Sequence, residues 1–309
     1  MHAIKRIAIL GMGGVGGFYG GKLAAHYAAN TDVEIIFIAR GENEKAIREK
    51  GLLLRTPSGE QIIHPKIVSH DPDAIGDVDL LICTIKAYDL EESIAAIAPC
   101  IGAETIVLPL LNGVDNLNRI HKLLPQATCW QGCSYIVSRL TNPGVVIETG
   151  IWNQLYFGSE VSTEQKIQQL ENIFTEAGIN AKGIKEITPV VWTKFLFLSP
   201  IATMTTSLNL PMGAVLENEL HAATLCGLIA EIAGIAIAKK IPLPISIESD
   251  ILEKMRKLPF ATYSSMHFDQ SYGKKTEVDS LTGYVVKLGK ELGIPTPVHE
   301  LSLSVLNAL

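Results

Sequence analysis

An apolar strand runs directly into a glycine-rich turn in the stretch Ile7-Ala8-Ile9-Leu10-Gly11-Met12-Gly13-Gly14-Val15-Gly16. The spacing is GxGxxG: Gly11 permits the tight turn, Gly13 lets the backbone approach a pyrophosphate, and Gly16 allows close packing of helix on strand. The helix expected over 14–30 would direct its N-terminal N–H groups and positive dipole end at the phosphates. Bare GxGxxG spacings also occur at purely structural turns, but this context predicts dinucleotide binding by residues 11–16.

Strand-like and helix-like segments alternate through the first half of the chain. The expected strands are 6–10, 34–39, 79–85 and 105–110, and the expected helices are 14–30, 42–50 and 90–97. This alternation predicts an α/β fold, a Rossmann-type doubly wound parallel sheet. We expect 52–64 to form a hairpin inserted into that sheet, and 133–137 with 145–157 to extend it in antiparallel fashion around Asn142-Pro143-Gly144.

The character of the sequence changes to helical at Thr188, which is expected to cap a helix with Pro189 in its first turn. Apolar periodicity predicts further helices over 217–239, 247–256 and 277–293. Pro200 lies inside a helical run and should kink or break it. The sequence therefore predicts a dinucleotide-binding domain over 1–186 and an all-helical substrate domain over 187–309.

Composition limits the classes of function. The 309 residues are 47% hydrophobic and carry a net charge of −6, and no segment concentrates basic residues, so nucleic-acid binding is not expected. The apolar runs 195–204 and 229–238 are shorter than the ~20 residues that span a bilayer. The first strand leaves no room for a signal peptide. Five scattered cysteines indicate neither disulfides nor a metal site, and we expect a cytoplasmic enzyme.

Polar residues follow the expected strands at their carboxyl ends, where open α/β sheets bind ligands. Arg40 ends the second strand, where NAD sites carry an acidic residue, and its guanidinium can pair with the 2′-phosphate of NADP. Glu42 and Glu44 lie nearby, and a solvated arginine is the alternative interpretation. Lys86 and Asn112 follow the next two strands, although each alone is also typical of a turn.

Motifs in both halves of the chain match a known family. The first half contains the turn 11–16, Arg40, Ile85-Lys86-Ala87 and Leu111-Asn112-Gly113-Val114. The second half contains Trp192-Thr193-Lys194, Ser264-Ser265-Met266-His267-Phe268-Asp269, Thr276-Glu277-Val278-Asp279, Thr282-Gly283-Tyr284 and Gly293-Ile294-Pro295-Thr296-Pro297. In this order the motifs resemble those of the ketopantoate reductase (2-dehydropantoate 2-reductase) family, and the resemblance covers nearly the whole chain.

The resemblance implies NADP-dependent reduction of a small 2-keto acid, with 2-dehydropantoate, and hence pantothenate biosynthesis, as the leading hypothesis. It assigns Lys194 as the proton donor, Asn112 as the bridge between nicotinamide ribose and substrate, and Ser265 as a contact of the substrate carboxylate. An ammonium is suited to that role, because hydride addition develops negative charge on the ketone oxygen.

The cofactor contacts implied by the resemblance are the turn 11–16, Arg40, Lys86, Asn112, the Ser138 backbone and Glu277. A carboxylate such as Glu277 would also favour the charged form of Lys194. Read without the family, Lys194 is a solvated helix residue, Glu277 a helix N-terminal carboxylate and Ser265 a helix cap.

Three positions depart from the family pattern. Where characterised members carry asparagines that hydrogen-bond the substrate, this chain has Leu198, Ala202 and Met212. Each lost hydrogen bond to a buried polar group costs about 1–3 kcal/mol. Either hydroxyls at Ser199, Thr203, Thr205 or Thr206 compensate, or the substrate is a different small 2-keto acid.

Two other functions remain open. A non-catalytic NADPH-binding sensor would use the same fold, but the joint presence of Lys194, Asn112, Ser265 and Glu277 argues against it. A related two-domain dehydrogenase acting on amino-acid-derived or acyl substrates would need additional cationic groove residues, which the sequence does not reveal. The apolar helical half could also pair in a homodimer.

Overall fold

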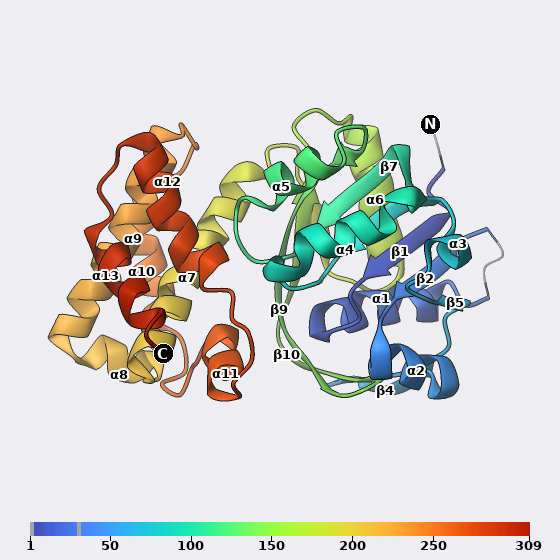
Figure 1. Ribbon diagram of the computed structural model, residues 1–309, viewed down its shortest axis with the longest axis horizontal. Coiled ribbons are helices and arrows are strands. Elements are labelled where there is room, and N and C mark those ends of the chain that lie inside the picture. The colour runs from blue at the N-terminus through green and yellow to red at the C-terminus, as the bar shows by residue number, and fades with distance from the viewer. Residues whose placement is uncertain (1–2, 30–31) are drawn as a thin grey trace. The chain divides into compact units, whose positions relative to one another are not determined.

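The computed structural model describes residues 3–29 and 32–309 and divides into two compact units (Figure 1). The first unit comprises Met1–Leu111 and Asp115–Ile187, and the second comprises Asn112–Val114 and Thr188–Leu309. The short segment 112–114 therefore belongs to the second unit, although it directly follows a strand of the first. The domain limits 1–186 and 187–309 stay a proposal from the sequence.

A six-stranded parallel sheet forms the centre of the first unit, in the order β5-β2-β1-β6-β7-β8. The strands are β1 (Arg6–Leu10), β2 (Glu34–Ile38), β5 (Ile67–Val68), β6 (Val78–Cys83), β7 (Ile101–Pro109) and β8 (Thr128–Cys129). Ile7 of β1 is paired with Ile35 on one side and Leu80 on the other. The predicted doubly wound sheet is confirmed, and the strand order changes direction beside β1, where such folds bind dinucleotides.

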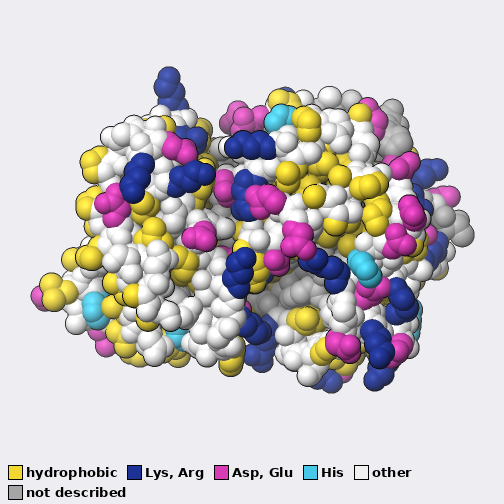
Figure 2. Space-filling model, viewed as in Figure 1, with side chains coloured by type: hydrophobic (Ala, Val, Ile, Leu, Met, Phe, Trp, Pro, Cys, Tyr) yellow, Lys and Arg dark blue, Asp and Glu magenta, His cyan; other side chains and the backbone are white. Residues whose placement is uncertain are grey.

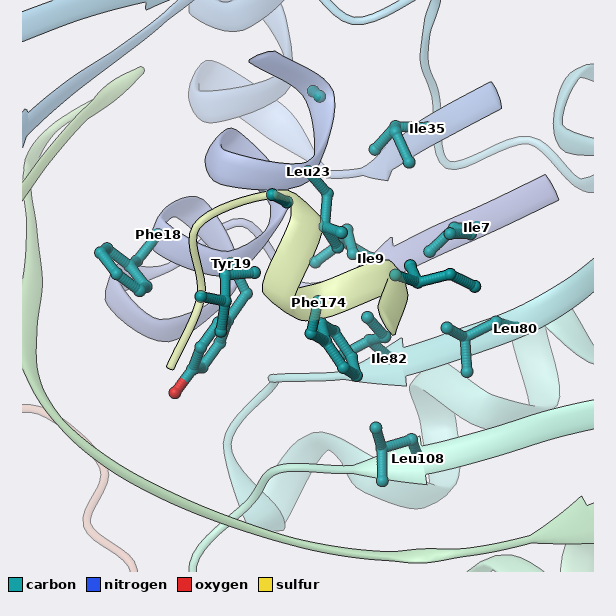
Figure 3. Packing of buried hydrophobic residues seen from close by; sticks show 14 of the residues in the cluster. Ile7, Ile9, Phe18, Tyr19, Leu23, Ile35, Leu80, Ile82, Leu108 and Phe174 are labelled. Carbon is teal, nitrogen blue, oxygen red and sulfur yellow. The ribbon is translucent and has the colours of Figure 1, made fainter. Parts of the chain in front are cut away.

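Helices cover both faces of the parallel sheet because successive strand residues point to opposite sides. On one face, Ile7 and Ile9 join a core with α1 (Gly14–His26), α2 (Gly41–Lys50) and α6 (Glu164–Glu176). Figure 3 shows this packing around Leu23 of α1 and Phe174 of α6. On the other face, Ala8 joins a core with α3 (Pro72–Ile75), α4 (Leu90–Ile97) and α5 (Asn116–Leu123). Short 3-10 turns, η1 (Ala87–Asp89) and η2 (Ala98–Cys100), flank α4.

The predicted hairpins form, but the prediction that they join the parallel sheet is wrong. They build a second sheet in the order β11-β10-β3-β4, with β9 also paired to β10. Its strands are β3 (Leu52–Thr56), β4 (Gly59–Ile63), β9 (Gln131–Asn142), β10 (Val145–Gly158) and β11 (Ala181–Gly183). This second sheet packs closely on α1, since methyl groups added at Gly17 and Gly21 would meet its residues Val146, Leu54 and Ile63.

The second unit is helical, as predicted. Its helices are α7 (Thr188–Leu208), α8 (Met212–Glu217), α9 (Glu219–Ala238), α10 (Ile247–Arg256), α11 (Ser265–Ser271), α12 (Tyr284–Leu292) and α13 (Pro297–Leu306). The predicted helix 217–239 is interrupted at Asn218, whose side chain caps α9 by accepting from the N–H groups of Leu220 and His221. The predicted helix 277–293 opens instead with a π-helical turn, η3 (Asp279–Gly283).

Pro200 does not break α7, which is continuous from Thr188 to Leu208. The proline and its neighbours Leu196, Ile201 and Met204 are buried. Burial of these side chains in the core of the second unit outweighs the ~3 kcal/mol that an internal proline costs a helix. The helix therefore holds Lys194 and the residues that follow it on one rigid element.

Within residues 3–29 and 32–309, one helix, α9, is long and apolar enough to cross a membrane by length and composition. The sequence prediction considered only the shorter run 229–238 within it. In the structure, 39% of its most apolar window is buried, and Leu225, Leu228 and Ile232 lie in the core of the second unit. Core helices of globular proteins pass the same test. On the face shown in Figure 2, acidic, basic and apolar side chains are interspersed.

Candidate active site

The glycine-rich turn of the first unit joins β1 to α1. Gly11 has φ of +94°, a conformation that favours glycine, and its N–H donates to the Ile38 carbonyl at 3.0 Å. A methyl group added at Gly16 would overlap the Gly11 carbonyl oxygen and the Thr84 hydroxyl. Two of the three motif glycines are thus required by the turn and by close packing of α1.

Gly13 differs from its neighbours, since a methyl group added there would meet no atom within 4 Å. Its φ of −80° is open to any residue, so nothing in the protein itself requires glycine at this position. Gly13 is also the N-cap of α1, and no side chain caps that helix. Open space in front of uncapped helical N–H groups fits the pyrophosphate of a dinucleotide, which would lie against the backbone there.

Two residues that the sequence analysis did not select hold this turn in place. Thr84, directly after β6, donates from its hydroxyl to the carbonyl of Gly11 at 2.6 Å and of Leu10 at 3.1 Å. Asn43 of α2 donates to the Met12 carbonyl at 2.9 Å and accepts from the Gly144 N–H at 2.8 Å. The only sequence feature that could have indicated this role for Thr84 is its position at the end of a strand. No sequence feature indicated the role of Asn43.

Arg40 is the N-cap residue of α2, directly after β2 and Ala39. Its guanidinium lies 3.3 Å from the Glu92 carboxylate and 3.4 Å from the Ser93 hydroxyl, and its side chain is about half exposed at 55%. An exposed ion pair of this length contributes little. The guanidinium is therefore held at the strand end without being buried, so an incoming anion can still reach it.

The remaining cofactor residues predicted in the first unit lie on two other elements. Lys86 follows β6 and is half buried at the start of η1, where its carbonyl accepts from the Asp89 N–H at 2.9 Å. Ser138 lies on β9, and its backbone carbonyl packs so closely on Gly14 that a side chain at Gly14 would overlap it. The first turn of α1 thus lies directly against the Ser138 backbone.

In the second unit, three predicted residues form a hydrogen-bonded chain. The Lys194 ammonium of α7 donates to Asn112 Oδ1 at 3.1 Å, and Asn112 Nδ2 donates to Glu277 Oε2 at 3.4 Å. Only one orientation of the amide satisfies both contacts, with its oxygen toward the cation and its nitrogen toward the carboxylate. Glu277 is buried, at 4% exposure. A cation, an amide and a carboxylate, brought from three distant parts of the sequence, therefore share one site.

Local structure explains how Glu277 reaches this site. Its carbonyl accepts from the N–H groups of Ser280 and Leu281, both at 3.1 Å, and the next carbonyl, that of Val278, accepts from the Gly283 N–H at 2.9 Å in the π-helical turn η3. Leu281 is buried in the core of the second unit. The turn therefore anchors the backbone of Glu277 to the core. Such π-turns often occur at functional sites.

Ser265 is the first residue of α11 and is exposed. The residue before it, Ser264, caps α11 by accepting from the His267 N–H and hydrogen-bonds the Thr205 hydroxyl of α7 at 2.8 Å. Ser264 therefore acts as the cap, a role that the sequence interpretation gave to Ser265 as the alternative to substrate binding. The start of α11 is tied to the same helix that carries Lys194.

The part of the chain that the structure describes contains no group of three or more His, Cys, Asp or Glu side chains able to hold a metal ion. An ammonium next to an amide and a carboxylate can donate a proton to a developing oxyanion and stabilise its charge. The arrangement thus suits addition to a carbonyl group.

Comparisons with known proteins agree with this chemistry. The family model described as ketopantoate reductase PanE/ApbA matches residues 7–161, and its C-terminal counterpart matches residues 186–309. The uncharacterized oxidoreductase YkpB of Bacillus subtilis (strain 168) is 28% identical over 298 residues, which cover 96% of this chain and 95% of that protein.

Two solved structures are similar over nearly their whole length. The 2-dehydropantoate 2-reductase from Porphyromonas gingivalis W83 is 33% identical, covers 98% of this chain and 99% of its own, and has a TM-score of 0.86. D-mandelate dehydrogenase with NADH and anilino(oxo)acetate is 24% identical, with coverages of 98% and 97% and a TM-score of 0.86. The second likeness shows a shared fold alone.

Proposed function

Because the chain belongs to the ketopantoate reductase PanE/ApbA family, we propose that this oxidoreductase reduces a small 2-keto acid with NADPH, to give the 2-hydroxy acid. The observation that carries the proposal is the chain from Lys194 through Asn112 to Glu277. Within the family, 2-dehydropantoate is the first substrate to test, and its reduction would serve pantothenate biosynthesis in the cytoplasm.

We assign cofactor binding to the first unit on three features. Open space at Gly13 and the uncapped N-terminus of α1 fit the pyrophosphate, with Met12, Gly14 and Val15 completing the turn. Arg40 would pair with the 2′-phosphate of NADPH, and Lys86 would add a second positive charge. The Ser138 backbone is proposed to contact the nicotinamide half, and Glu277 of the second unit is proposed to lie beside the cofactor. The bound cofactor supplies the hydride, and in D-mandelate dehydrogenase, which shares the fold, the corresponding ligand is NADH.

We assign the reaction itself to side chains of the second unit. Hydride addition to the 2-keto carbon places negative charge on the carbonyl oxygen, and the Lys194 ammonium donates a proton to that oxygen. Asn112 holds the ammonium by accepting one of its hydrogens, and the Glu277 carboxylate fixes the amide orientation. Ser265 is proposed to contact the substrate carboxylate. The lysine regains its proton from solvent, so each turnover consumes one NADPH and one proton.

The test is NADPH oxidation, followed by absorbance, with a panel of 2-keto acids that includes 2-dehydropantoate. Lys194→Ala should lower kcat by roughly 10²–10⁴-fold, the usual contribution of general acid catalysis. Lys254→Ala on α10 is the matched control, since Lys254 is an exposed lysine of the same unit, and it should retain wild-type turnover. Tight NADPH binding with no turnover on any acid would refute the proposal and favour a sensor.

A further inference from the structure

The side chain one helical turn after Lys194 on α7 is apolar. Positions four apart lie on the same face of a helix, so Leu198 follows the ammonium along its own face. Leu198 is half buried, yet it is not among the apolar side chains packed on the core of the second unit, all of whose residues the structure describes. Its neighbour Phe197 is in that set. Core packing within the unit therefore gives no reason for a leucine at 198.

The hydroxyl groups at Ser199, Thr203, Thr205 and Thr206 of α7 lie inside the second unit. Thr203 hydrogen-bonds Thr282 of η3 at 2.7 Å, and Thr205 hydrogen-bonds Ser264 at 2.8 Å. Ser199 and Thr206 are also buried, at 0% and 4% exposure. None of these four hydroxyls is presented on the surface of the helix, and the hypothesis that they compensate for missing asparagines stays a prediction from the sequence.

The other two positions that departed from the asparagine pattern are also closed to a substrate. Ala202 and Met212 are 1% and 0% exposed and belong to the core of the second unit. The Met212 N–H is held by the Thr262 carbonyl at 2.9 Å, which fixes the start of α8. Of the three substituted positions, Leu198 alone remains accessible beside Lys194.

Because Leu198 is accessible on the same helix face as Lys194, we propose that the substrate is a 2-keto acid whose side chain is apolar and carries no hydroxyl group. Leu198 is the residue that contacts this side chain. The inference rests on the proposed function and names its substrate class. Burying a hydroxyl without a partner would lower kcat/KM by roughly 5- to 150-fold. A leucine at 198 cannot supply that partner, so it selects for the apolar acid.

A matched pair of substrates tests the inference directly. Trimethylpyruvate differs from 2-dehydropantoate only by a methyl group in place of the hydroxymethyl group. The wild-type enzyme should reduce trimethylpyruvate with a kcat/KM that is higher by roughly 5- to 150-fold. Equal or higher kcat/KM for 2-dehydropantoate would overturn the inference while leaving the proposed reductase intact. No turnover on either acid or on the wider panel, with NADPH still bound, would refute both.

Leu198→Asn tests the residue itself. The amide should shift the ratio of the two kcat/KM values toward 2-dehydropantoate by roughly ten-fold or more, because it can pair with the hydroxyl. Leu301→Asn, the same exchange at an exposed position of α13, should leave the ratio unchanged. An unchanged ratio in Leu198→Asn, with folding verified by thermal unfolding, would overturn the role of Leu198.

Discussion

The two glycines Gly13 and Gly16 should respond in opposite ways to the same added methyl group. At Gly13 the new carbon meets no atom within 4 Å, and φ of −80° is favourable for alanine. Gly13→Ala should therefore leave the unliganded protein as stable as before or more stable by about 0.4–1 kcal/mol, since alanine restricts the unfolded chain. If the pyrophosphate lies against this backbone, the methyl group takes its place, and NADPH affinity should fall by at least about ten-fold, or about 1.4 kcal/mol.

At Gly16 the methyl group would overlap the Gly11 carbonyl oxygen and the Thr84 hydroxyl, and would lie 3.1 Å from the Gly11 carbonyl carbon. Because the carbonyl is backbone, α1 must move away from β1. Overpacking of this kind costs about 1–3 kcal/mol, so Gly16→Ala should lower the melting temperature measurably. The substitution should weaken NADPH binding as well, since the turn itself is displaced.

The assay is thermal unfolding of the unliganded proteins together with NADPH titration followed by nicotinamide fluorescence. The two variants separate ligand contact from folding. Gly13→Ala should lower the NADPH affinity without lowering the melting temperature, whereas Gly16→Ala should lower the melting temperature. Wild-type NADPH affinity in Gly13→Ala would refute the placement of the pyrophosphate at this turn. A melting temperature for Gly16→Ala equal to wild type would refute the packing argument.

Three further outcomes follow from single contacts. Arg40→Glu should weaken NADPH binding at least about ten-fold while NADH binding changes less, with the exposed Arg55→Glu as control; equal losses for both cofactors would contradict a 2′-phosphate contact. Asn43→Ala removes bonds to Met12 and Gly144 and should cost about 1–3 kcal/mol of stability, measured by denaturant unfolding. Burial lowers the pKa of His299, although Glu231 opposes the shift. The unfolded chain therefore binds a proton at His299 more readily than the folded protein, and the free energy of unfolding should fall as the pH drops below about 6.5. His299→Asn, unfolded thermally between pH 5 and 7, should flatten that pH dependence.

Local sequence patterns predict those parts of the fold whose structure depends on residues close together in the sequence. The strand before Gly11 and the helix after it follow from apolar residues beside a turn that only glycine tolerates. The hairpin over 52–63 likewise follows from its turn. Its place in a separate sheet depends on Val146 meeting α1, a contact between segments far apart in the sequence, which no local pattern contains.

Rules about single residues failed where burial overrides them. Pro200 marks a helix break in any isolated segment, yet Leu196 and Ile201 on either side are buried and α7 continues. Burial also determines which side chains of α7 a substrate could contact. The sequence shows hydroxyls at 203 and 205, but it does not show that they hydrogen-bond Thr282 and Ser264 inside the second unit. Which side chains face a substrate is set by the phase of the helix against its core.

The position of Asn112 shows how a correct local rule can still leave the chemistry undetermined. The strand-end rule selects Asn112 because it follows β7, and the rule is silent about its partners. Those partners are 82 and 165 residues further along the chain, and the segment 112–114 packs with them in the second unit. A lysine, an amide and a buried carboxylate come into contact only when three segments converge. The family motifs could name these residues in advance, whereas the order of contacts, with the amide between the two charges, required the structure.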